Sequence, residues 1–133
     1  NNSNLADVSG HGTKIAGAAA AALNNGVGIA GVAGAAQIMP LRITDAGGTA
    51  WSSSVAQALT YAADRGARVA NISYGFTGSS TVQTAAKYMK DKGGLVFMSA
   101  GNSGAEQATA PTTSFIVVSA TDPNDARAGF SNW

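Results

Sequence analysis

The sequence contains no cysteine, one histidine and few charged residues, and each scarcity excludes a class of protein. Without cysteine there is no disulfide, no thiolate metal site and no cysteine nucleophile. Charged residues make up 11% of the 133 residues, the formal net charge is +1, and no basic run occurs. Neither a nucleic acid nor a membrane is therefore favoured as a partner. No apolar run is long enough to span a bilayer.

The chain has enough apolar residues to fold, because 45% of its residues are hydrophobic. A chain of 133 residues is one domain at most, so we expect residues 1–133 to form a single domain. Periodicity and turn residues predict helices and strands in alternation. The predicted helices are 15–23, 52–66 and 80–94, and the predicted strands are 37–44, 67–75, 94–102 and 114–121.

This order predicts an α/β fold with three layers and a mostly parallel sheet. The continuous apolar run at 94–102 is typical of a parallel strand covered on both faces. We expect Asn24 to Gly26 to end the first helix and serines 52–54 to cap the second, which Gly66 ends. The residues expected on the buried faces of the last two helices are Val55, Leu59, Ala62, Val82, Ala85, Ala86 and Met89.

Functional groups collect at the carboxyl ends of the strands in parallel sheets. In this chain those ends fall at residues 44–48, 73–75 and 99–102. The helix that His11 opens is expected to begin at the same edge. The sequence therefore predicts a site built from these loops.

Three motifs carry candidate chemistry. His11, the only histidine, lies between two glycines in SGHGTKIAG, where it is either structural or a general base. Asn102 in SAGNSG is either a turn residue or a side-chain N–H donor to an oxyanion. NISYG, at the end of a predicted strand, suits pairing with an extended peptide.

A fourth motif, GVGIAG at residues 26–31, matches the dinucleotide fingerprint G-x-G-x-x-G. That fingerprint needs a strand before it and a helix after it, whereas here a predicted helix precedes and a predicted strand follows. We therefore interpret it as a glycine-rich turn, and we expect no cofactor to be required for the chemistry.

Taken in order and spacing, these stretches resemble the subtilisin-like serine proteases over nearly the whole chain. GHGTKIAG is similar to the histidine motif of that family, with Lys14 where a second histidine is usual. NISYG resembles the substrate-binding strand, and SAGNSG resembles the block with the oxyanion asparagine. ATAPTTSFIVVSAT and RAGFSN resemble the strand and turn that follow.

The resemblance implies roles for individual residues. His11 would be the general base of a Ser-His-Asp triad, and Asn102 would donate to the oxyanion. A protein or peptide substrate would contact three groups of residues: Ser73, Tyr74 and Gly75 along its backbone, Ser99, Ala100 and Gly101 in the pocket wall, and Gly48 and Thr49 at a more distant subsite. The family also implies a secreted, extracellular protein, and the oligomeric state stays open.

A calcium ion is a further implication of the resemblance. Many members of the family wrap a structural calcium ion, mainly with carbonyl oxygens, at the positions of Leu23, Asn25, Val27 and Ile29. Oxygen ligands on a flexible loop suit that ion. These four residues supply one side-chain ligand and no carboxylate, which argues against tight binding by this chain.

Two members of the triad have no counterpart in the sequence. The nucleophile of the family lies in Gly-Thr-Ser, which does not occur here, and neither does G-x-S-x-G. The orienting aspartate of the family lies upstream of the histidine on an earlier strand, and we interpret Asp7 as a loop residue. We therefore expect the central part of a subtilisin-like catalytic domain, incomplete at both ends and inactive alone.

Two hypotheses remain open at this point. One is a serine endopeptidase of which these residues are a part. The other is a non-catalytic peptide-binding or structural α/β domain with the same fold. An upstream aspartate strand and a downstream Gly-Thr-Ser in the full coding sequence would favour the first.

Overall fold

The structure, a computed structural model, describes residues 6–107 and 112–133 and divides into two units. The first unit extends to Thr49 and the second runs from Ala50 to Trp133. The first four residues of the stretch ATAPTTSFIVVSAT lie outside the described residues. That residues 1–133 form a single domain stays a prediction.

The first unit contains one helix, α1 (His11–Ala20). It begins earlier than predicted and ends before Asn24, so the predicted end was wrong. Ala21 leaves the helix with a φ of −59° and a ψ of 142°. The returning chain then bonds the helix end, since Val32 N donates to Ala18 O at 3.1 Å and Ala33 N to Ala19 O at 2.8 Å.

Glycine at position 31 makes this close return possible. A Cβ there would overlap the backbone of Ala20 and Ala21, so no other residue fits without a shift of the chain. Gly26 and Gly28 have positive φ values of 70° and 68°. Residues 26–31 are thus a turn that closes onto α1, as the sequence predicts.

The strand predicted at 37–44 does not form. Residues 37–43 have no regular secondary structure, and Ile38, Met39 and Leu41 are all exposed. Pro40 has no backbone N–H to donate to a neighbouring strand. Among the described residues, the sheet has no strand from this part of the chain.

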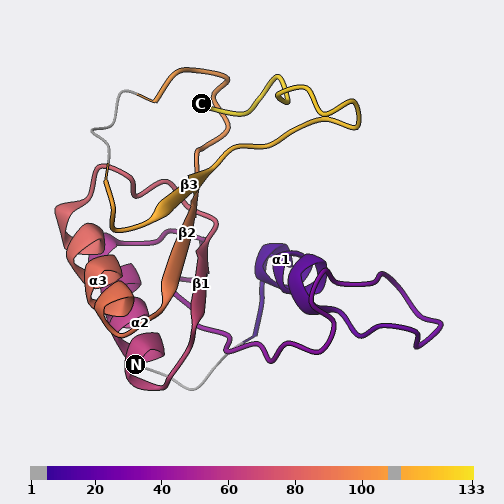
Figure 1. The fold of residues 1–133 in the computed structure, drawn as a ribbon, viewed down its shortest axis with the longest axis horizontal. Helices are drawn as coiled ribbons and strands as arrows, with labels where there is room; N and C mark the ends of the chain where they lie inside the picture. Colours follow the sequence, from indigo (N-terminus) through magenta and orange to yellow (C-terminus); the bar gives the residue numbers. More distant parts are fainter. Residues whose placement is uncertain (1–5, 108–111) are drawn as a thin grey trace. The chain divides into compact units, whose positions relative to one another are not determined.

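The second unit is built on a parallel sheet. It contains β1 (Val69–Ile72), β2 (Leu95–Ser99) and β3 (Ile116–Val118), in the order β1-β2-β3 with both pairs parallel (Figure 1). The prediction of an α/β fold with a parallel sheet is confirmed. The strands are shorter than predicted because the segments at their carboxyl ends leave the sheet as loops.

Helices α2 (Ser52–Asp64) and α3 (Ser80–Asp91) pack against each other beside this sheet (Figure 1). Every residue predicted on their buried faces is buried, and Ala63 joins them. Gly66 follows α2 with a φ of 77°, as expected for a helix end. The predicted serine cap of α2 was wrong: Trp51 holds the cap position without a side-chain bond, whereas Ser79 caps α3 by accepting from Val82 N at 3.4 Å.

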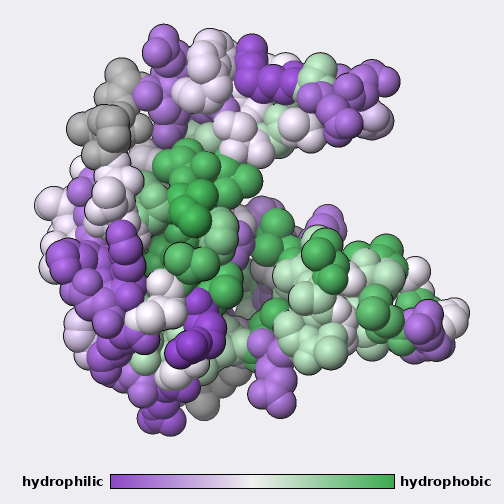
Figure 2. Space-filling model, viewed as in Figure 1, coloured by the Kyte–Doolittle hydropathy of each residue, from purple (hydrophilic) through white to green (hydrophobic). Residues whose placement is uncertain are grey.

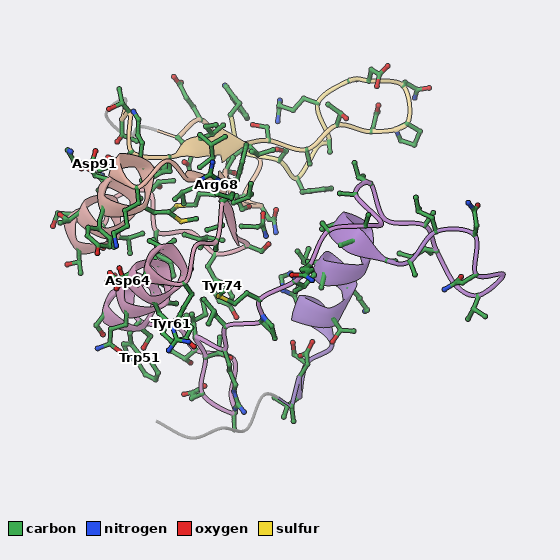
Figure 3. All side chains as sticks on the ribbon, turned by 60° about the horizontal axis from the view of Figure 1, so that its bottom comes forward. Trp51, Tyr61, Asp64, Arg68, Tyr74 and Asp91 are labelled. Atoms are coloured by element: carbon green, nitrogen blue, oxygen red, sulfur yellow. The ribbon has the colours of Figure 1, made fainter. Side chains whose placement is uncertain are left out.

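A polar contact also joins the two helices. The carboxylate of Asp64, which is labelled in Figure 3, accepts from Tyr88 Oη at 2.7 Å and from Lys92 Nζ at 2.6 Å. The bond from Lys92 lowers the pKa of Asp64, and the same bond raises the pKa of Lys92 to about 12.

One face of the sheet is buried and the other is not. Ile72, Val96 and Met98 are buried, whereas Val69 is 60% exposed and Leu95 49% exposed. Apolar surface appears in the region of the strands in Figure 2. Both helices of this unit lie against one face, so residues 50–133 alone do not cover 94–102 on both faces, and cover on the second face stays a prediction. The third layer of the predicted fold is not contributed by residues 50–133.

In the part of the chain that the structure describes, none of the helices is long and apolar enough to cross a membrane.

Candidate active site

Two of the predicted site segments leave the sheet at the same edge. Strands β1 and β2 are parallel neighbours, and Ile72 pairs with Met98 at the end of their register. Residues 73–75 and 99–102 follow directly, so the parallel pairing brings them to one edge. This part of the predicted arrangement is confirmed.

The segment after β1 presents small and aromatic groups. Ser73 Oγ accepts from Asn71 Nδ2 at 2.8 Å. The ring of Tyr74, labelled in Figure 3, stacks on Phe76 with centroids 6.3 Å apart. Gly75 is exposed. An exposed glycine next to a half-buried tyrosine leaves backbone accessible at this position, which is what an extended peptide requires.

The segment after β2 is held tightly at its start. Ala100 is 1% exposed, and its N–H donates to Val118 O at 3.0 Å. Gly101 N donates to Ser99 Oγ at 3.1 Å. Gly101 has a φ of 101°, a backbone conformation that favours glycine. The chain therefore turns sharply before Asn102.

Asn102 lies beyond that turn with its side chain exposed. Within residues 6–107 and 112–133, that side chain makes no hydrogen bond, although asparagine amides at turns commonly bond their own backbone. An amide without an internal partner is available to donate to a ligand. The geometry is compatible with an oxyanion donor, and this role stays a prediction.

The last residues of the chain run beside this loop. Gly104 N donates to Phe130 O at 2.8 Å, Gln107 N donates to Trp133 O at 2.7 Å, and Trp133 N donates to Ala105 O at 3.3 Å. Arg127 also lies over the Trp133 ring, with Cζ 3.9 Å from its centroid. Sequence reasoning linked RAGFSN to a following turn but missed that this segment supports the Asn102 loop, defined here as residues 100–105.

In the first unit, His11 is the first residue of α1 and its side chain is exposed. Gly10 precedes it with a φ of 74°, and His11 N donates to Ser9 Oγ at 3.1 Å. The helix start therefore presents the imidazole outward. His11 and Asn102 belong to different units, and their assembly into one site stays a prediction.

Asp7 organises the start of α1. Its Oδ1 accepts from Gly10 N at 2.8 Å, and its Oδ2 accepts from both Thr13 N and Thr13 Oγ1 at 2.7 Å. The bonds from Thr13 hold the pKa of Asp7 far below its usual range. Asp7 lies in the loop before the helix, as predicted. The sequence analysis missed its bonds to the first turn of α1, although aspartate is common near helix starts.

The turn with Gly48 and Thr49 is organised by Asp45. Asp45 Oδ1 accepts from Gly47 N and Thr49 N, each at 2.9 Å, and Gly48 has a φ of 82°. The structure thus gives this turn a definite shape. Its role as a distant subsite stays a prediction.

The four residues at the positions implied for calcium, from Leu23 to Ile29, offer few oxygen ligands from their side chains. Leu23, Val27 and Ile29 are exposed apolar residues, and Asn25 Oδ1 already accepts from Val27 N at 3.0 Å. Across the described residues, no group of three or more His, Cys, Asp or Glu side chains could hold a metal ion. Calcium prefers several oxygen ligands, carboxylates among them, so these residues do not fit it well. Calcium binding stays a prediction, and no step of the function is built on it.

Comparison with known proteins identifies the family. The model of the subtilase family, peptidase S8, matches residues 1–133. Thermitase of Thermoactinomyces vulgaris is 42% identical over 136 residues, which cover 100% of this chain and 49% of thermitase. A thermophilic serine proteinase of Bacillus sp. strain AK1 is 41% identical over 130 residues, which cover 96% of this chain and 32% of that protein.

A solved structure gives the same result. A protease of Pseudoalteromonas arctica PAMC 21717 superposes with a TM-score of 0.78 and 29% identity, covering 90% of this chain and 39% of that one. The chain thus spans a third to a half of the length of the curated relatives named above. From its sequence and its fold together, the chain belongs to the subtilase family.

Proposed function

We propose that these residues form part of the catalytic domain of an extracellular serine endopeptidase that acts on proteins or peptides. In this proposal the chain supplies the general base His11 and the oxyanion donor Asn102. The observation that carries the proposal is the Asn102 loop, which ends a parallel strand with a side-chain amide that has no partner in the described chain. Membership of the subtilase family supports the reaction class.

Each residue has a defined step. A serine attacks the carbonyl carbon of the peptide bond while its hydroxyl proton passes to His11. The negative charge that develops on the carbonyl oxygen accepts a hydrogen bond from the Asn102 amide. His11 then gives the proton to the leaving amine, and water hydrolyses the acyl-enzyme by the same steps in reverse order.

Substrate contacts follow from the two sheet-edge segments. Residues 73–75 lie along the substrate backbone, and residues 99–101 form a wall of the pocket before the scissile bond. Parallel pairing of β1 and β2 supports this arrangement, because it brings the two segments to the same end of the sheet. Gly48 and Thr49 border a more distant subsite in the same proposal.

The isolated chain is proposed to be inactive. The 133 residues hold no Gly-Thr-Ser and no G-x-S-x-G. A base and an oxyanion donor have nothing with which to form an acyl-enzyme when the nucleophile is missing. The serine and the orienting aspartate must come from outside these residues.

A hybrid enzyme tests the proposal. Residues 1–133 replace the matching stretch of the thermophilic serine proteinase of Bacillus sp. strain AK1, to which they are 41% identical. The hybrid should cleave casein and react with a serine-directed fluorophosphonate probe, and His11→Ala should abolish both. Asn124→Ala, at an exposed asparagine whose side chain makes no hydrogen bond in the described chain, is the matched control.

Two results would contradict the proposal. A folded hybrid that neither cleaves casein nor takes up the probe would favour a non-catalytic peptide-binding domain. Covalent labelling of the isolated 133-residue chain at one serine would contradict the claim that it is inactive alone.

A further inference from the structure

Asn132 makes an unusually complete set of side-chain bonds to the Asn102 loop. It is 7% exposed. Its Oδ1 accepts from Ser103 N and Ser103 Oγ, each at 2.9 Å, and from Ala105 N at 3.2 Å. Its Nδ2 donates to Ala100 O at 3.0 Å. One buried amide therefore holds the loop at both of its ends.

The backbone of Asn132 makes further hydrogen bonds, one to the Asn102 loop and two to neighbouring serines. Its N–H donates to Gly101 O at 3.0 Å. Its carbonyl oxygen accepts from Ser119 Oγ at 2.8 Å and from Ser131 Oγ at 2.9 Å. Ser119 directly follows β3, so Asn132 connects the Asn102 loop to the neighbouring strand. These bonds lie within one unit of the chain.

Asn102 itself lies between the bonded groups. Gly101 O on one side and Ser103 N on the other both bond Asn132, whereas the Asn102 side chain bonds nothing in the described chain. The backbone on both sides of Asn102 is therefore fixed through a different residue. Such supporting bonds set the direction in which an unbonded side chain can point.

We propose that Asn132 is the positioning residue that aims the Asn102 amide, a role that rests on the proposed function of Asn102. Asn132 touches neither substrate nor reacting atoms. It acts by fixing the Asn102 loop so that the donor is in place before charge develops on the substrate. A donor that is already in place does not need to reorganise during the reaction.

The chemistry of the bonds explains why an amide suits this position. Both an acceptor and a donor are used, and aspartate would keep the acceptor while placing oxygen against Ala100 O. Close packing also leaves no room for a side chain at either glycine of the loop. A Cβ at Gly101 would lie 2.7 Å from Asn132 Nδ2, and one at Gly104 would lie 2.8 Å from Gly129 O.

Hydrogen exchange in the full 133-residue chain tests the structural half of the proposal. In Asn132→Ala, the Ser103 and Ala105 amides should exchange at least about 10-fold faster while the β2 amides stay protected, because only the local bonds are lost. Asn124→Ala should change none of them. Unchanged exchange at Ser103 and Ala105 would overturn the proposal.

A second variant covers the case in which Asn132→Ala unfolds the unit. In Asn132→Asp the introduced carboxylate still accepts from Ser103 and Ala105. At low pH the protonated acid can also donate its O–H to Ala100 O, as the native amide does, so protection of these two amides should rise as the carboxylate is protonated. If protection of the Ser103 and Ala105 amides does not change with pH, apart from the ordinary pH dependence of exchange, the proposal is overturned as well.

Kinetics of the hybrid enzyme test the catalytic half. Asn132→Ala should lower kcat roughly 10- to 100-fold with little change in KM, as expected for a small misplacement of a catalytic group. In a background that already carries Asn102→Ala, the same change should cost almost nothing more. A merely structural role would instead give the full additional loss in both backgrounds.

The two failures are distinguishable. If Asn102→Ala alone leaves kcat unchanged, the proposed function of Asn102 is wrong and positioning has no catalytic meaning. If Asn102→Ala lowers kcat but the effect of Asn132→Ala adds to it in full, Asn102 keeps its role and the positioning proposal is wrong.

Discussion

Gly101→Ala should destabilise the second unit strongly, although it adds a single methyl group. Gly101 has a φ of 101°, and alanine at such an angle costs about 1–3 kcal/mol in backbone strain. The new Cβ would also lie 2.7 Å from Asn132 Nδ2. That side chain is buried and bonded, so moving it leaves polar groups without partners at a cost of about 1–3 kcal/mol.

One effect opposes this loss. Alanine restricts the unfolded chain more than glycine does, which favours folding by about 0.4–1 kcal/mol. We therefore expect a net loss of about 2–4 kcal/mol in the free energy of unfolding. For a chain of this length, that is a fall of about 8–15 °C in Tm.

Urea and thermal unfolding, followed by tryptophan fluorescence, measure this loss, because Trp51 and Trp133 both lie in the second unit. Protein concentrations are kept where light scattering shows a monomer. Gly129→Ala is the matched control: its φ is not positive and a Cβ there meets nothing within 4 Å. The control should change stability by less than about 0.5 kcal/mol. Equal effects at positions 101 and 129 would refute the reasoning.

Two further predictions concern other parts of the chain. Asp7→Asn should weaken the start of α1; since the pKa of Asp7 is lowered on folding, its contribution is full above the ordinary value of 3.8 and is lost as pH falls through the lowered pKa. Protection of the Thr13 amide against hydrogen exchange, corrected for the ordinary pH dependence of exchange, should fall below pH 3.8 in the wild type but not in the variant. Equal pH dependence of this protection in the two proteins would contradict it. Leu95→Lys, on the uncovered face of the sheet, should reduce self-association of the isolated chain in light scattering, whereas Thr81→Lys on exposed α3 surface should not. Equal scattering by the two variants would show that this face does not drive association.

The parts of the fold that sequence predicted best are those fixed by local pattern. The buried residues of α2 and α3 recur at helical spacing, and glycines end these elements, so both helices were predicted closely. Strands β1 to β3 were predicted because each is a short apolar run bounded by turn residues. The same reasoning failed at 37–44, where an apolar run alone cannot supply the neighbouring strand that it needs.

Long-range contacts explain what the sequence missed. The end of α1 is set by bonds from residues 31–33, which no local signal near Ala20 predicts. Asn132 bonds residues up to 32 positions earlier in the chain, so its role is invisible to motif spacing. Asp7 was different, because an aspartate before a helix is a local signal that was available but assigned only to the loop.

The candidate site also has a part that the sequence predicted and a part that only the structure revealed. The residues of the Asn102 loop were identified from sequence, and the pairing of β1 and β2 brings them beside residues 73–75. The support beneath this loop, from Gly129 to Trp133, emerged only from the structure.

The most direct test of the account is the effect of Asn102→Ala on kcat in the hybrid enzyme, measured on active-site-titrated protein. The amide bond to the oxyanion is made mainly in the transition state, so kcat should fall while KM changes little. The expected loss is roughly 10²–10³-fold, a magnitude known from a subtilisin and therefore borrowed from the family rather than worked out from this structure. If Asn102 is only a turn residue, the variant will lose stability but keep a normal kcat in its folded fraction, and that result would contradict the account.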